Sequence, residues 1–133
     1  ESTMSFSKAI SAELHDTPVL DTALPNATTL TSAPFLCSGS ALGLEIVGTV
    51  TKAATIASGK KLTVKLLASE TKNGTFNEYA VLCTATDKAL AAGTELFRFA
   101  PVSTVPFWKK ISISADSDLS AGKIMVGLVR KVG

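Results

Sequence analysis

The residues that could carry acid–base or metal chemistry are few and scattered in this sequence. His15 is the only histidine, and His15-Asp16 could begin a catalytic array with a serine, but no Gly-x-Ser-x-Gly elbow presents one. Asp116 and Asp118 could offer two carboxylates to calcium, yet the other oxygen ligands of a calcium loop are missing. No Cys/His cluster has zinc spacing, and no Gly-rich loop ends in Gly-Lys-Ser/Thr. We therefore expect a solvated His15, a polar turn at the aspartates, and no catalytic, metal or cofactor site.

The two cysteines offer little redox chemistry. Cys37 and Cys83 could pair only if their strands lie side by side, and both follow apolar residues. A thiol in such surroundings usually behaves as a small core residue. We expect two free thiols.

The charge balance argues against a polyanionic ligand. The net charge is +2, and charged residues make up 18% of the chain. The basic residues form no stripe that could release counterions from a nucleic acid, so we expect no such partner. We expect the adjacent basic pairs to be exposed lysines that guard sheet edges; they are Lys60-Lys61, Lys109-Lys110 and Arg130-Lys131. The mean hydropathy of +0.33 suggests that some apolar surface meets a partner.

The uncharged stretch between Asp21 and Glu45 is long enough to raise the question of a membrane span. Pro25 and Pro34 interrupt it, together with an asparagine and many serines and threonines, so we expect it not to cross a bilayer. The beginning of the chain has no basic residue followed by a long apolar block, which predicts no secretory signal. Met4 is the expected natural start, after three additional residues.

Apolar residues recur with period two from position 41 onward, in short runs separated by turn residues. This alternation predicts six strands and the residues that share a face in each: Leu42, Leu44 and Ile46; Leu62, Val64, Leu66 and Ala68; Tyr79, Val81 and Cys83; Glu95, Phe97 and Phe99; Phe107, Ile111 and Ile113; Ile124, Val126 and Leu128. Two weaker strands are expected around 28–30 and 35–37, where Pro34 marks an edge or a break.

Turn residues separate these runs at Ser58-Gly59, Asn73-Gly74, Ala92-Gly93 and Ala121-Gly122, and Asn73-Gly74 predicts a tight hairpin. The pattern predicts an all-β protein, an antiparallel β-sandwich of jelly-roll type with about eight strands. We expect an N-terminal arm over residues 1–15 and a single sandwich domain over 16–133. Residues 7–14 fit either a helical turn or an extended strand.

The aromatic residues cluster, and four of them fall between Phe97 and Trp108. Because strand residues alternate faces, Phe107 and Trp108 cannot both enter the core. If Phe107 packs inward, Trp108 faces outward, where large amphipathic side chains often anchor protein interfaces. The alternative is that Trp108 covers its own sheet. The interface candidates are Pro106, Phe107, Trp108 and Tyr79.

The order of strands and turns resembles the jelly-roll cement (decoration) proteins of tailed-bacteriophage capsids. The likeness spans roughly residues 40 to 130 and rests on Gly59–Ser69, Lys72–Phe76, Ala92-Gly93 before Phe97–Phe99, and Pro106–Ser114 followed by Ser120–Ile124. That family usually has an Arg and a Tyr in the strand after the proline, where this chain has Trp108, Lys109 and Lys110.

The resemblance implies a non-catalytic virion protein that binds the major capsid protein on the capsid exterior. It also implies a homotrimer, assembled in the host cytoplasm, that bridges capsomers and stabilises the shell. The runner-up is a carbohydrate-binding β-sandwich of a phage receptor-binding protein or adhesin, with Trp108 and Tyr79 as the aromatic candidates for stacking on sugar rings. An enzyme that depends on His15 or on an aspartate pair is the third hypothesis.

Overall fold

The computed structural model describes residues 15–37, 44–100 and 108–130, and these residues form strands and no helix. The strands are β1 (His15–Ala23), β2 (Thr29–Thr31), β3 (Phe35–Leu36), β4 (Leu44–Lys52), β5 (Ala54–Thr55), β6 (Lys61–Ser69), β7 (Asn77–Thr86), β8 (Ala89–Leu90), β9 (Glu95–Phe99), β10 (Trp108–Ala115) and β11 (Lys123–Arg130).

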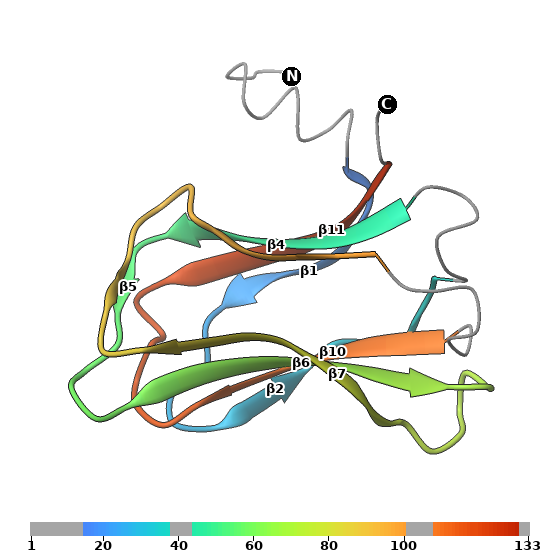
Figure 1. The fold of residues 1–133 in the computed structure, drawn as a ribbon, viewed down its shortest axis with the longest axis horizontal. Helices are drawn as coiled ribbons and strands as arrows, with labels where there is room; N and C mark the ends of the chain where they lie inside the picture. Colours follow the sequence, from blue (N-terminus) through green and yellow to red (C-terminus); the bar gives the residue numbers. More distant parts are fainter. Residues whose placement is uncertain (1–14, 38–43, 101–107, 131–133) are drawn as a thin grey trace.

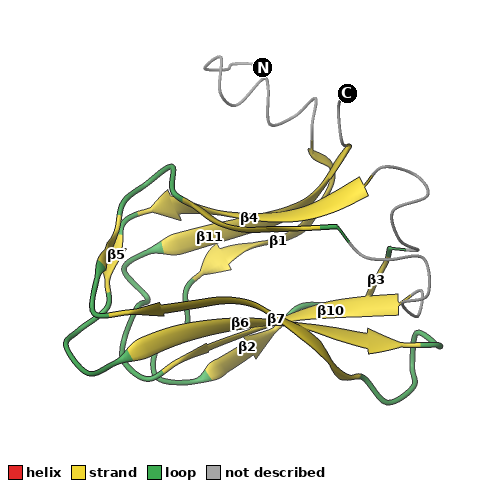
Figure 2. Ribbon diagram, viewed as in Figure 1, coloured by secondary structure: helices red, strands yellow, loops and turns green. Residues whose placement is uncertain are grey.

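Two antiparallel sheets lie face to face (Figures 1 and 2). One is a four-stranded sheet in the order β1-β11-β4-β9, and the other is a five-stranded sheet in the order β2-β10-β6-β7, with β3 also paired to β10. Without the two-residue strands β3, β5 and β8, eight strands remain, and we count these from one to eight along the described chain. In this count the four-stranded sheet has the order 1-8-3-6, and the other sheet has the order 2-7-4-5. This is the order of a jelly roll, and it confirms the predicted fold class.

The core fills the space between the sheets because alternate residues of the long strands are apolar. β6 and β10 alternate buried and less buried positions along almost their whole length. The two inner faces supply fully or nearly fully buried side chains that include Ile46, Val50, Leu62, Val64, Leu66, Phe97, Ile111, Ile113, Ile124 and Val126. The predicted faces of β6 and β11 are therefore confirmed, and in β10 the prediction is confirmed for Ile111 and Ile113.

The strand β1 was missed by the sequence-based prediction, which placed no strand over residues 15–23. β1 begins at His15 and pairs with β11 along its length, and it is an edge strand of the four-stranded sheet. Pro18 and Asp21 break the apolar alternation, which an edge strand tolerates because one of its sides forms no ladder hydrogen bonds. Residues 7–14 lie outside the described residues.

The predicted turns differ in how they use glycine. Gly59 and Gly93 have positive φ angles of 75° and 92°, as expected for chain reversals. The tight hairpin predicted at Asn73-Gly74 is wrong, because residues 70–76 connect β6 to β7 as a longer loop. Ser69 organises this loop: its Oγ donates to the carbonyl of Thr71 at 2.8 Å and accepts from the amide of Thr71 at 3.2 Å.

The strand β7 departs from the predicted alternation. Its pairing with β6 shifts register twice, between the partners of Val64 and Lys65 and between those of Leu66 and Leu67. Such irregularities change which residues face the core. Val81 is 51% exposed as a result, whereas Cys83 packs against the core. The expectation that Tyr79, Val81 and Cys83 share one buried face is therefore wrong.

Candidate binding surface

The outer face of the five-stranded sheet divides into two parts. The part nearer the β2 end carries short polar side chains: Thr29 and Thr31 on β2 lie opposite Ser114 and Ser112 on β10. The Thr29 and Ser114 hydroxyls are 2.8 Å apart and hydrogen-bonded. This part of the face is polar and offers little apolar surface for a partner.

The other part of the same face lies where β3 pairs with the beginning of β10 (Figure 2), and it carries the exposed side chain of Leu36. Trp108 begins β10 and lies opposite Leu36 on β3 and Ser69 on β6. Its neighbour Lys109 belongs to the inner face with Ile111, so Trp108 faces outward. The structure thus places Trp108 on the outer face, its role as an interface residue stays a prediction, and Pro106 and Phe107 lie outside the described residues.

The loop 70–76 contributes to this surface through two reciprocal contacts. The Lys72 ammonium lies 5.7 Å from the centroid of the Trp108 ring, and the Lys110 ammonium lies 4.4 Å from the centroid of the Phe76 ring. Both distances are in the range of a cation–π interaction. A loop cation thus covers a strand aromatic, and a strand cation covers a loop aromatic.

These contacts join six neighbouring side chains into one surface, which we call the Trp108 patch. Leu36 is 56% exposed, and Leu67 lies beside Lys110 on the neighbouring strand and is half-buried. The patch consists of Leu36, Leu67, Lys72, Phe76, Trp108 and Lys110. Sequence alone identified only Trp108, because the approach of Lys72 and Phe76 to β10 depends on how the loop folds back.

The two cations of the Trp108 patch differ from Arg98 in having no acidic partner among the described residues. Arg98 on β9 pairs with Glu45 at 2.8 Å and with Glu95 at 2.9 Å, and hydrogen bonds to Glu95 and then Glu45 raise the pKa of its guanidinium. Among the described residues, no carboxylate lies within ion-pair distance of Lys72 or Lys110. Both ammonium groups of the patch therefore contact aromatic rings and remain available to an acid.

Beneath the patch lies a buried cation that the sequence-based prediction placed wrongly. Lys109 was expected to guard a sheet edge, but it is fully buried in the central strand β10. The reason is its register, because it shares the inner face with Ile111 and Ile113. Its Nζ donates a hydrogen bond to the carbonyl of Cys37, and burial lowers its pKa from the ordinary value.

The second aromatic candidate, Tyr79, lies on a different surface. It is 38% exposed, and its ring meets the Phe99 ring edge-on with centroids 6.0 Å apart. Phe99 belongs to β9, the edge strand of the opposite sheet. Tyr79 therefore covers the side of the sandwich between the edge strands β7 and β9, and it does not extend the Trp108 patch.

The other residues singled out in the sequence occupy separate places. The backbone of His15 pairs with that of Val129, and Asp116 and Asp118 are exposed near the turn after β10. Asp118 Oδ1 accepts hydrogen bonds from the hydroxyl and the amide of Ser120, which lower the pKa of Asp118 and close this turn.

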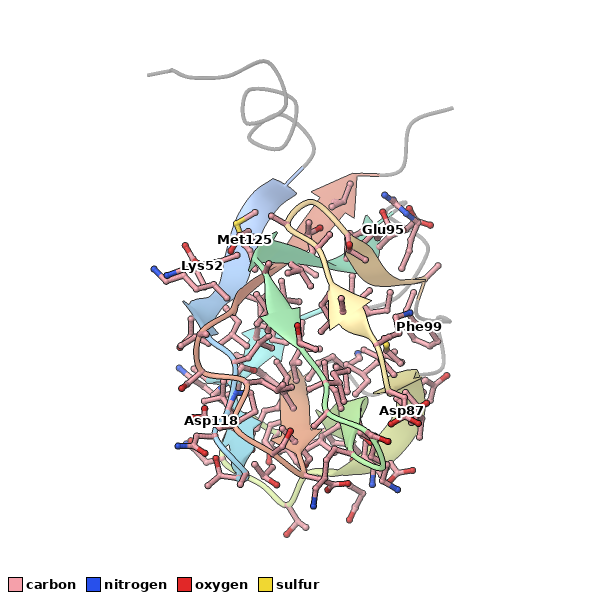
Figure 3. The ribbon with its side chains drawn as sticks, turned by 90° about the vertical axis from the view of Figure 1, so that its left-hand side faces the viewer. Lys52, Asp87, Glu95, Phe99, Asp118 and Met125 are labelled. Atoms are coloured by element: carbon pink, nitrogen blue, oxygen red, sulfur yellow. The ribbon has the colours of Figure 1, made fainter. Side chains whose placement is uncertain are left out.

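The acidic side chains of the described chain do not gather into a metal site. Figure 3 shows Asp87 and Asp118 on opposite sides of the sandwich. Within residues 15–37, 44–100 and 108–130, no three His, Cys, Asp or Glu side chains are close enough to hold a metal ion. No disulfide joins Cys37 to Cys83, as expected, and burial raises the pKa of Cys83. No helix in the described part of the chain is long and apolar enough to cross a membrane.

Comparisons with known proteins add little to this picture. No protein-family model matches the sequence, and no curated protein matches it. One similar solved structure is that of the N-terminal CBM22-1–GH10 modules of endo-1,4-beta-D-xylanase 10B from Clostridium thermocellum, complexed with xylohexaose. The match has a TM-score of 0.40 and 16% identity, and it covers 91% of this chain but only 27% of that chain. We draw no conclusion about function from this likeness.

Proposed function

We propose that this chain is a non-catalytic virion structural protein, a cement or decoration protein that binds the outer surface of a tailed-phage capsid. Two features support the proposal: the jelly-roll sandwich, which matches the fold expected from the resemblance, and the Trp108 patch. The partner is the major capsid protein, and the protein stabilises the shell by bridging capsomers.

The Trp108 patch is the observation that carries the proposal. An exposed leucine and two aromatic rings lie together at one end of a sheet whose outer face is polar where β2 pairs with β10. In protein interfaces, a few central aromatic residues surrounded by polar groups usually contribute most of the binding energy. A surface of this kind suits a subunit whose work is attachment to another protein.

Attachment through several copies explains how such a small protein could reinforce a shell. A stable protein interface buries about 800 Å² on each partner. When several protomers are joined in a trimer, binding of the first raises the effective concentration of the others at neighbouring sites, and avidity rises by about 10²–10⁴. Each bridged boundary between capsomers then resists outward pressure from packaged DNA.

A second candidate, a carbohydrate-binding module, is favoured by one specific feature. The Trp108 ring is half-buried on the outer face of the sheet, and such a ring could stack on a sugar if the Lys72 ammonium moved aside. Tyr79, which the sugar hypothesis also relied on, lies on another surface. A sugar site would therefore depend on Trp108 and Phe76 alone.

The test combines mass measurement, shell binding and glycan titration. We expect a solution mass three times that of one chain, and co-sedimentation with expanded, undecorated shells of the phage that encodes the protein. Because Trp108 is the only tryptophan, its fluorescence reports directly on the patch during titration with oligosaccharides. Failure to sediment with intact shells would overturn the cement proposal, and saturable quenching by a sugar would favour the second candidate.

A further inference from the structure

We propose that the Trp108 patch binds an acidic segment of the partner protein, with Lys72 and Lys110 each receiving a carboxylate while Leu36 and the two aromatic rings make apolar contact. This inference rests on the proposed function and adds the chemistry of the partner surface to it. It assigns the two ammonium groups as the determinants of partner choice.

The first reason to expect an acidic partner is that the two lysines of the patch have no carboxylate as an ion-pair partner in the described part of the chain. Lys65 is the nearest basic residue along the same outer face, and it is already paired with Glu78 at 3.0 Å. Lys72 and Lys110 are held over aromatic rings and have no carboxylate within ion-pair distance among the described residues. The exposed Glu70 in the same loop forms no ion pair with them. The patch therefore presents two positive charges that lack an acid.

The second reason is that the two ammonium groups lie over aromatic rings and beside apolar surface. Each ammonium is attracted to the face of a ring, which limits the positions it can take and lowers the entropy lost when a carboxylate binds. The ring faces and Leu36 supply apolar area directly beside the charges. A segment with carboxylates next to apolar side chains matches both features, whereas a nucleic acid needs a longer basic track.

A matched set of variants isolates the charges. Lys72→Gln/Lys110→Gln removes both, and Lys60→Gln/Lys61→Gln removes two exposed charges at the opposite end of β6. Lys72→Arg/Lys110→Arg keeps both the charge and the ring contacts. The circular dichroism and unfolding curves of all three variants should match those of the wild type before binding is compared.

The first measurement uses peptide probes and Trp108 fluorescence. We titrate the protein with a peptide of three Glu-Gly-Leu repeats and with peptides in which Gln or Lys replaces each Glu. Because exposed ion pairs are individually weak, we expect the Lys72→Gln/Lys110→Gln variant to bind the acidic peptide about tenfold more weakly than the wild type. The arginine variant and the Lys60→Gln/Lys61→Gln control should bind like the wild type. Equal binding of acidic and basic peptides would overturn the inference.

The second measurement uses expanded, undecorated shells and separates this inference from the proposed function. If wild-type protein does not bind shells, the cement function fails, and the peptide result still decides the chemistry of the patch. If wild-type protein binds, we expect about tenfold weaker binding by Lys72→Gln/Lys110→Gln and a loss of affinity with added salt. If Lys72→Gln/Lys110→Gln binds shells as tightly as the control Lys60→Gln/Lys61→Gln and the wild type, the inference fails and the cement function stands.

Discussion

The side-chain amine of Lys109 donates a hydrogen bond to the backbone carbonyl of Cys37, and both residues are buried directly behind the Trp108 patch. Lys109 lies on β10, and Cys37 follows β3, the strand that pairs with the beginning of β10. The bond therefore fastens the β3 segment to the strand that carries Trp108. It makes Lys109 a structural residue of the candidate surface.

Truncation of Lys109 should destabilise the fold more than its replacement by an apolar side chain of similar length. Lys109→Ala leaves a cavity and removes the donor, and we expect a loss of about 2–4 kcal/mol in the free energy of unfolding. Lys109→Met fills the volume without a charge and should change stability by less than about 1.5 kcal/mol. Urea unfolding of both variants checks this, and equal losses would show that packing of the stem contributes nothing.

The lowered pKa of Lys109 predicts a rise in stability with pH. The unfolded chain has the ordinary lysine pKa of about 10.4, so it binds more protons than the folded chain between the two pKa values, and the free energy of unfolding increases across that interval. Below the folded pKa, both states are protonated and the burial cost is fully present. Lys109→Met should lack this rise.

The thiol of Cys83 acts in the opposite direction, so the comparison needs the Lys109→Met variant as reference. Burial raises the pKa of Cys83, and the unfolded thiol therefore loses its proton first, which lowers stability as pH rises above about 8.5. Both proteins contain Cys83, so its effect cancels. Urea unfolding should show wild-type stability gaining on Lys109→Met as pH rises towards about 10; a flat difference would argue against a lowered lysine pKa.

Gly48 on β4 lies opposite Phe97 on β9, and the aromatic ring occupies the space that a side chain at Gly48 would need. Gly48→Ala should therefore lower the free energy of unfolding by about 1–3 kcal/mol, because the Phe97 ring must leave its position in the core. The double variant Gly48→Ala/Phe97→Leu should lose less stability than the sum of the losses in the two single variants. Strict additivity in thermal unfolding would mean that the two sites do not interact.

Trp108→Ala should weaken shell association more than it weakens the fold. The side chain is half-buried, so we expect a stability loss of about 1–2 kcal/mol, while removal of a central interface anchor should lower affinity for shells by at least about 2 kcal/mol, or about thirtyfold. Trp108→Phe keeps an aromatic face for Lys72 and should retain most of the binding. Sedimentation with shells and thermal unfolding measure the two losses, and equal losses would place the indole in a purely structural role.

The fold could be predicted from the sequence because its long strands alternate clearly. In β6 and β10, apolar residues at every second position face the core, and Gly59 and Gly93 mark chain reversals. β1 was missed because an edge strand tolerates Pro18 and Asp21, which break the pattern. The exposure of Val81 was missed because register shifts between β6 and β7 leave no mark on the sequence.

The candidate surface could be predicted only in part. Alternation along β10 is enough to place Trp108 outward, and the same alternation places Lys109 inward, although its charge suggested exposure. Lys72 and Phe76 could not be assigned to the surface, because their contacts with β10 arise from the path of the loop 70–76. These contacts between the loop and β10 depend on the tertiary structure, and neither residue type nor spacing along the sequence predicts them.

The orientation of the bound protein tests the central claim most directly. Expanded, undecorated shells incubated with the protein and imaged by cryo-electron microscopy should show added density on the outer surface between capsomers. We expect the five-stranded sheet to face the shell, with Leu36 and Trp108 in the contact. Shells without added density, or a bound protein whose four-stranded sheet faces the capsid, would contradict the account.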